Sequence, residues 1–140
     1  MSETENLWSG RFTGKPDAEV FQFQASFAFD RHLFEDDVQG SLAWVEALAG
    51  AGVLSAEEAA TIQDGLSFIL ERGRQDPEFF NTADEDVHTF VERTLIDRVG
   101  DVGRRLHTGR SRNEQVSLDL RLYLRRRIPV LQGALVDVVD

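Results

Sequence analysis

Apolar residues recur every three or four positions through most of the chain, which is the spacing of one face of an α-helix. Three such stripes span residues 30–50, 55–73 and 82–99. Because glycine readily ends a helix, we expect these stripes to stop at the glycines that follow them: Gly50, Gly52, Gly73, Gly100 and Gly103. The pattern therefore predicts three amphipathic helices.

Three capping boxes of the form Ser/Thr-x-x-Glu mark helix starts, at Ser55–Glu58, Thr82–Glu85 and Ser111–Glu114. The last one opens a fourth helix, with Pro129 expected to kink or interrupt it. Its apolar positions form a wide surface: Val116, Leu118, Leu120, Leu122, Leu124, Ile128, Leu131 and Leu135. So wide a surface predicts burial against several helices. No stop signal precedes Asp140, so we expect the chain to end inside a helix, as part of a longer protein.

The N-terminal segment has a weaker pattern. Residues 1–16 are expected to form an irregular arm, and a short helix is expected to start at Asp17. Phenylalanines at 21, 23, 27 and 29 alternate with other residues, but a single strand has no partner here, so we expect loop or helix. Since the four clear stripes are all helical, the sequence predicts an all-α fold.

Composition narrows the classes of function. The chain has no cysteine, which excludes disulfides and thiol chemistry and fits a reducing cytoplasm. The polar N-terminus is not a secretory signal, and the most apolar stretch is far too short to span a membrane. A net charge of -10 and a pI near 4.7 argue against nucleic acid, so the Arg125–Arg127 run is interpreted as a solvated or intersubunit face.

Hydrogen-bond donors are concentrated at residues 107–115, directly before the fourth helix. Arg110 and Arg112 flank Ser111, and Asn113 follows. A helix N-terminus carries unpaired amides and partial positive charge, so this segment is a candidate site for a carboxylate or phosphate. The alternative is that Ser111 only caps the helix and the arginines pair with surface acids.

Two other polar segments stand out. Acids in the first turn favour the helix dipole, so Asp84 and Glu85 are mostly explained structurally, whereas His88 is a candidate to orient or contact a substrate. We expect no metal there, because no further ligand lies nearby in the sequence. Ser26 and Asp30 either cap the following helix or belong to a site.

These segments together resemble a known family. The run LHTGRSRNEQV at 106–116, followed by Asp119–Arg125, closely resembles the first signature region of the argininosuccinate lyases, in the fumarase/aspartase superfamily. Four more segments match in the same order: Leu7–Phe12, Ala25–Leu33, Asp37–Ser41 and Asp84–His88. Ser9 stands where that family usually has glycine. Fumarase and adenylosuccinate lyase share the fold but not the HTGRSRN run.

The resemblance implies an all-α architecture and a reaction. Residues 17–106 would form an N-terminal helical domain, and residues 107–140 a substrate-binding loop and the first long helix of a central helix bundle, truncated here. The family cleaves argininosuccinate to arginine and fumarate in arginine biosynthesis, without a cofactor. It works as a homotetramer whose active sites each combine three chains, and we expect a cytoplasmic protein without nucleic-acid or membrane partners.

The resemblance also implies roles for residues. Ser26 and Asn113 would contact the substrate, and Arg112, Thr108 and Ser111 would shape the carboxylate pocket. Two further positions, Asp86 and His88, would lie at its edge near the guanidinium.

The family's acid/base histidine and catalytic serine lie in later segments, so no catalytic residue is expected in these 140 residues and the chain alone should be inactive. Two alternatives stay open: a non-catalytic, crystallin-like structural protein on the same scaffold, and a helical module whose arginine face binds an acidic partner.

Overall fold

The computed structural model describes residues 17–139, and every regular element in that range is helical. The all-α prediction is therefore confirmed over the described part of the chain, whereas the arm expected at residues 1–16 lies outside it. The elements in chain order are α1 (Ala18–Gln24), α2 (Phe27–Asp30), η1 (Arg31–Leu33), α3 (Phe34–Gly50), α4 (Ala56–Gln75), η2 (Pro77–Phe80), α5 (Val87–Val99), η3 (Gly100–His107) and α6 (Arg112–Val139).

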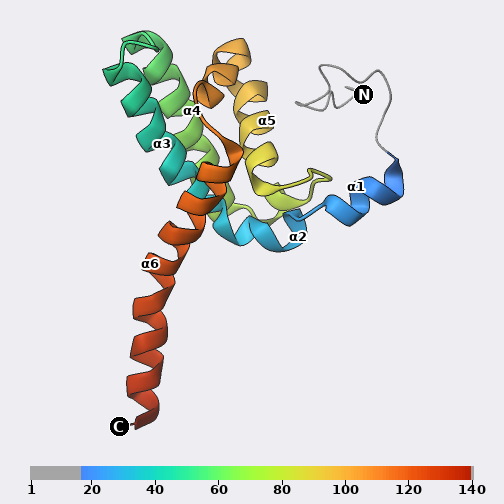
Figure 1. Cartoon of the computed structure of the whole chain (residues 1–140), viewed down its shortest axis with the longest axis vertical. Helices are drawn as coiled ribbons and strands as arrows, with labels where there is room; N and C mark the ends of the chain where they lie inside the picture. The colour runs from blue at the N-terminus through green and yellow to red at the C-terminus, as the bar shows by residue number, and fades with distance from the viewer. Residues whose placement is uncertain (1–16, 140) are drawn as a thin grey trace.

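Three helices form the body of the structure. Figure 1 shows α3 and α4 side by side with α5 against them, while α6 starts at this body and extends well beyond it. The short helices α1 and α2 extend to another side. Helix α6 thus has two parts, a first half packed on α3 and a second half that projects away.

The core lies between α3, α4 and α5. Its centre is Phe90 of α5, which is 1% exposed and meets Phe27, Phe79 and Phe80 with ring centroids 5.1–5.7 Å apart. Tilted and edge-to-face ring pairs of this kind add stability beyond the area that they bury. The fully buried aliphatic residues come from all three helices: Val38, Val45, Ile62, Leu66, Ile69, Val87, Val91 and Leu95.

Helix α4 has the capping box that the sequence predicts. Ser55 Oγ accepts from the Glu58 amide, and Glu58 Oε2 accepts from the Ser55 amide at 2.8 Å. The sequence predicts that this helix ends near Gly73, which is two residues too early, because α4 continues to Gln75. Gly73 serves packing instead, since a Cβ there would lie 2.3 Å from Phe34 Cε1.

The capping box expected at Thr82–Glu85 is wrong, because α5 begins at Val87. Asp86 is the N-cap, and its carboxylate accepts from the Thr89 amide at 2.6 Å. The Val87 amide donates to Asp30 Oδ1 at 3.1 Å, so a residue 57 positions earlier helps to cap this helix. Asp84 is bound instead by Arg93, with contacts of 2.8 and 2.7 Å.

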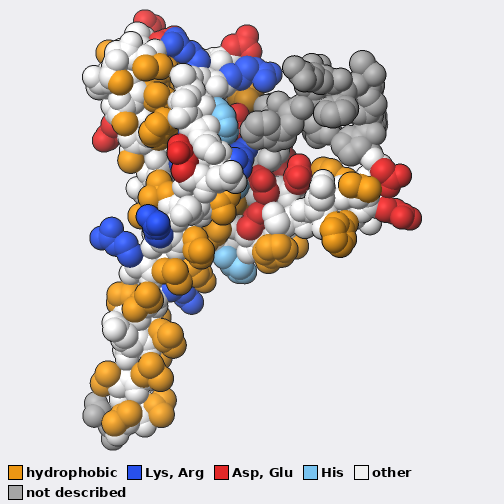
Figure 2. All heavy atoms as spheres, viewed as in Figure 1, with side chains coloured by type: hydrophobic (Ala, Val, Ile, Leu, Met, Phe, Trp, Pro, Cys, Tyr) orange, Lys and Arg blue, Asp and Glu red, His pale blue; other side chains and the backbone are white. Residues whose placement is uncertain are grey.

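Helix α6 continues through Pro129 without an interruption. It differs from its prediction in its burial. Its apolar residues from Val116 onward are largely uncovered within the described chain, with exposed fractions rising to 62% at Leu131 and 83% at Val138. Figure 2 shows these side chains gathered over the projecting half. The expected burial therefore is not provided by residues 17–139 themselves. Among the described helices, none is long and apolar enough to cross a membrane.

Candidate functional site

Two of the predicted site segments meet at the start of α5. The amides of Ser26 and Phe27 both donate to the Glu85 carbonyl, at 2.7 and 3.1 Å. Ser26 Oγ donates to Asp30 Oδ2 at 2.5 Å, and Asp30 in turn accepts from the Val87 amide. Burial raises the pKa of Asp30, although the Ser26 bond opposes this. Ser26 and Asp86 are thus brought together, although 60 residues separate them.

The turn before α6 presents its polar side chains in two directions. Thr108, Ser111 and Asn113 are exposed, and Gly109 has φ +68°, a left-handed conformation that suits glycine. The Ser111 amide donates to Glu114 Oε1 at 3.1 Å, which is one half of the predicted capping box. Arg110 instead points inward, 8% exposed, and its Nη1 donates to Ser41 Oγ at 2.9 Å. The expectation that Arg110 flanks an anion site is therefore wrong, because its guanidinium is buried.

Arg112 lies at the edge of the turn, where two acceptors from the described part of the chain hold it. Its Nη1 donates to Gln115 Oε1 at 2.8 Å and its Nη2 to Glu92 Oε2 at 3.3 Å. His107 also lies 3.6 Å from Glu92. Since Glu92 is one helical turn from His88 on α5, this helix supports both the start of α6 and the His88 region.

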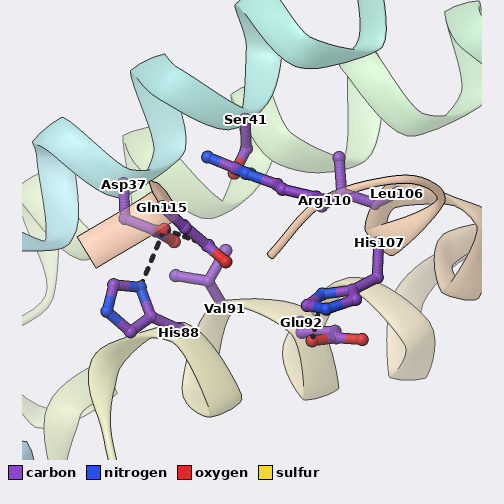
Figure 3. A pocket seen from close by; sticks show the side chains of 9 residues that line it. All are labelled: Asp37, Ser41, His88, Val91, Glu92, Leu106, His107, Arg110 and Gln115. Carbon is purple, nitrogen blue, oxygen red and sulfur yellow. Dashed lines mark hydrogen bonds and ion pairs between the residues drawn. The ribbon is translucent and has the colours of Figure 1, made fainter. Parts of the chain in front are cut away.

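Behind these residues lies a buried polar cluster that the sequence analysis missed. His88 Nδ1 lies 3.0 Å from Asp37 Oδ1 and 3.3 Å from Asp119 Oδ2, and both aspartates are fully buried. Gln115 Nε2 donates to the same Asp37 oxygen at 2.5 Å. Figure 3 shows His88 and Gln115 converging on Asp37 from α5 and α6. Each of the three helices carries a polar residue at an inward position, but the sequence alone does not show that these residues meet.

The charges in this cluster compensate one another. Burial opposes ionisation of Asp37, but the bonds from His88 and Gln115 hold its pKa below the ordinary range. Burial also disfavours charge on His88, yet Asp37 raises its pKa. Burial and the Asp37 charge raise the pKa of Asp119 to about 8. We therefore assign an ionised Asp37 and a neutral Asp119 at neutral pH, with His88 Nδ1 carrying the proton that it donates to Asp37.

Asp37, His88 and Asp119 could each offer a metal ligand, with all the ligand atoms within 4.8 Å of one another. However, Asp37 Oδ1 already receives bonds from His88 and Gln115, and the buried Arg110 adds positive charge beside both aspartates. These side chains are therefore better suited to share protons and hydrogen bonds with one another than to bind a metal ion.

The adjacent cavity is small. Its volume is about 10 Å³, which is room for one water molecule. Nine side chains line it, and Figure 3 labels them: Asp37, Ser41, His88, Val91, Glu92, Leu106, His107, Arg110 and Gln115. A dicarboxylate cannot enter this space, so a substrate of that size would bind at the exposed turn and not inside the cluster.

Comparison with known proteins places these residues in a family. A family model described as lyase matches residues 10–140. The chain is 48% identical to an argininosuccinate lyase of Thioalkalivibrio sulfidiphilus, over 97% of this chain and 31% of the relative. It is 48% identical to that of Geobacillus thermodenitrificans, over 89% of this chain and 27% of the relative, and 45% identical to that of Desulforudis audaxviator, over 94% and 29%. The chain thus spans about 30% of the length of these relatives, and it belongs to the lyase family.

Proposed function

We propose that the chain supplies the substrate-carboxylate wall of an argininosuccinate lyase, which cleaves argininosuccinate to arginine and fumarate. The observation that carries this is the donor-rich turn before α6, a helix of 28 residues, in which Thr108, Ser111 and Asn113 are exposed. The argininosuccinate lyases matched above, at 45–48% identity, support the same substrate.

The chemistry suits this position. Argininosuccinate has three carboxylates, and removal of a proton next to one of them builds negative charge on that carboxylate. The partial positive charge of a helix N-terminus, with nearby side-chain donors, stabilises such charge. Ser111 and Asn113 offer donors there, and Thr108 adds a hydroxyl. Since the charge is largest in the transition state, these donors would assist the reaction as well as binding.

The remaining predicted residues would contact the substrate or shape the edge of its pocket. Ser26 would contact the substrate from its position beside the start of α5, with Asp86 at the pocket edge toward the guanidinium. Arg112 would shape the carboxylate pocket while Glu92 and Gln115 hold it. His88 is 3% exposed, so it would act at the edge and not as an open ligand-binding group.

The proposal extends to the division of the chain and to its assembly. Residues 17–106 would form an N-terminal helical domain, and residues 107–140 the substrate-binding loop and the first helix of a central bundle. The exposed apolar face of α6 would pack against other helices of a homotetramer in the cytoplasm. The proton-transfer groups would come from other segments and subunits, and the elimination would need no cofactor.

A chimera tests the proposal. Residues 1–140 would replace the matched segment of the Geobacillus thermodenitrificans argininosuccinate lyase, which supplies the rest of the protein. We expect the chimera to release fumarate from argininosuccinate, and the 140-residue chain alone to release none. A folded, tetrameric chimera without activity, or turnover by the isolated chain, would contradict the proposal.

A further inference from the structure

Asp37 of α3 contacts two residues beside the candidate site, His88 and Gln115. Its Oδ1 lies 3.0 Å from His88 Nδ1 on α5 and 2.5 Å from Gln115 Nε2 on α6. It is 0% exposed, so it cannot itself meet a ligand from solvent. Its carboxylate is the point at which three helices meet through hydrogen bonds.

The network continues from Asp37 to the surface. Gln115 uses its amide nitrogen on Asp37 and its amide oxygen on Arg112, at 2.5 and 2.8 Å. Because an amide has both a donor and an acceptor, the bond to Asp37 also fixes which end faces Arg112. The orientations of His88 and Arg112 therefore both depend on one buried carboxylate.

We propose that Asp37 is a positioning residue for the carboxylate site: it orients His88 directly and Arg112 through Gln115, and so keeps the edge of the carboxylate pocket in one fixed arrangement. The role in catalysis rests on the proposed function above, whereas the coupling of His88 to Arg112 does not. Preorganised groups of this kind need little rearrangement when charge develops.

A substitution of the neighbouring Asp36 distinguishes this positioning role from a general contribution to stability. It is also buried, at 5% exposure, and it also joins α3 to α6, through Arg126 Nη2 at 2.7 Å. It makes none of the contacts to His88 or Gln115 described above. Asp36→Asn is therefore a matched control for Asp37→Asn, because each removes a buried negative charge between the same two helices.

Several charged groups act on His88, and the test must take them into account. Asp37 comes from α3, Asp86 from the start of α5 and Asp119 from α6. The carboxylate of Asp30 also interacts with the His88 charge, and Arg110 adds positive charge beside Asp37 and Asp119. Of these, Asp37 makes the shortest contact to the ring, at 3.0 Å.

NMR titration of the histidines in the 140-residue chain tests the direct contact. The chain has only three histidines, and His88 is the buried one. In the wild type we expect a protonated Nδ1 at pH 7 and a His88 pKa above its ordinary value, since Asp37 raises it. Asp37→Asn should lower that pKa, and Asp36→Asn should leave it in place. An unprotonated Nδ1 in the wild type would overturn the proposal without any variant, as would equal effects of the two variants.

Activity of the chimera tests the positioning role. We expect Asp37→Asn and Gln115→Ala each to lower kcat/KM by about 10- to 100-fold, the effect of one lost charge-assisted or buried hydrogen bond. Gln115→Ala should act mainly on KM, because it leaves His88 bound to Asp37. Folded variants with wild-type kcat/KM, or an equal loss in Asp36→Asn, would overturn the role. If the unmodified chimera is inactive, the proposed function fails, while the NMR titration still decides whether Asp37 orients His88.

Discussion

Replacing Asp119 with asparagine should stabilise the fold, although it alters a fully buried polar residue. Burial and the adjacent Asp37 charge raise the pKa of Asp119 from 3.8 to about 8. At about 1.4 kcal/mol for each pH unit, this difference sets a ceiling near 6 kcal/mol for the cost of ionising Asp119 in the fold. The amide has no charge and can donate to Asp37 as a protonated carboxyl does, so we expect a realised gain of about 1–4 kcal/mol at pH 8.

The pH dependence has a definite sign. Between pH 3.8 and about 8, the folded state keeps a proton on Asp119 that the unfolded state has released. The free energy of unfolding therefore falls as pH rises through this range, by up to about 1.4 kcal/mol per unit. His88 acts in the same direction, since its raised pKa gives stability that is lost as pH rises through that value. The difference in the free energy of unfolding between the wild type and Asp119→Asn isolates the contribution of Asp119.

Urea unfolding from pH 5 to 9, at one fixed protein concentration, measures this difference. The advantage of Asp119→Asn should grow with pH and level off near pH 8, whereas Asp36→Asn should show no such growth. Parallel profiles for wild type and Asp119→Asn, or a variant that is less stable at pH 8, would refute the assignment of a neutral Asp119.

Three further predictions concern packing, capping and association. Phe90→Ala should lower the free energy of unfolding by about 3–5 kcal/mol, because it empties the centre of the aromatic core, and a loss below about 1 kcal/mol in urea would contradict that placement. Ser55→Ala should cost about 0.5–2 kcal/mol through the lost N-cap of α4, and an unchanged melting temperature would count against it. The 140-residue chain should self-associate through α6, and Leu131→Glu should weaken this in sedimentation experiments; a monomeric wild type would argue against the interface.

Features that depend only on residues close together in the sequence were predictable from it. The helical stripes and the Ser55 box depend on spacing within a few residues, and both were confirmed. The box at Thr82 failed because non-local contacts decide that region: Arg93 binds Asp84, and Asp30 helps to cap α5. A local motif cannot reveal a competing partner elsewhere in the chain.

The buried cluster was not predictable for a similar reason. Asp37, His88 and Asp119 come from three helices, and each alone is an ordinary polar residue in an amphipathic pattern. Likewise, the sequence gives no sign that Arg110 turns inward to Ser41 while Asn113 remains exposed. The donor-rich turn itself was predicted, because a helix start with adjacent polar side chains is a local feature.

The most direct test of the central claim is kcat/KM for argininosuccinate in the chimera with Asn113→Ala. Asn113 is exposed at the start of α6, so its loss should leave folding intact while removing a donor to the substrate. Asn81→Ala is the control, since Asn81 is also exposed but lies at the end of η2. We predict a loss of at least about tenfold for Asn113→Ala and none for Asn81→Ala. Equal kcat/KM in both variants and the unmodified chimera would contradict a substrate-binding role for this turn.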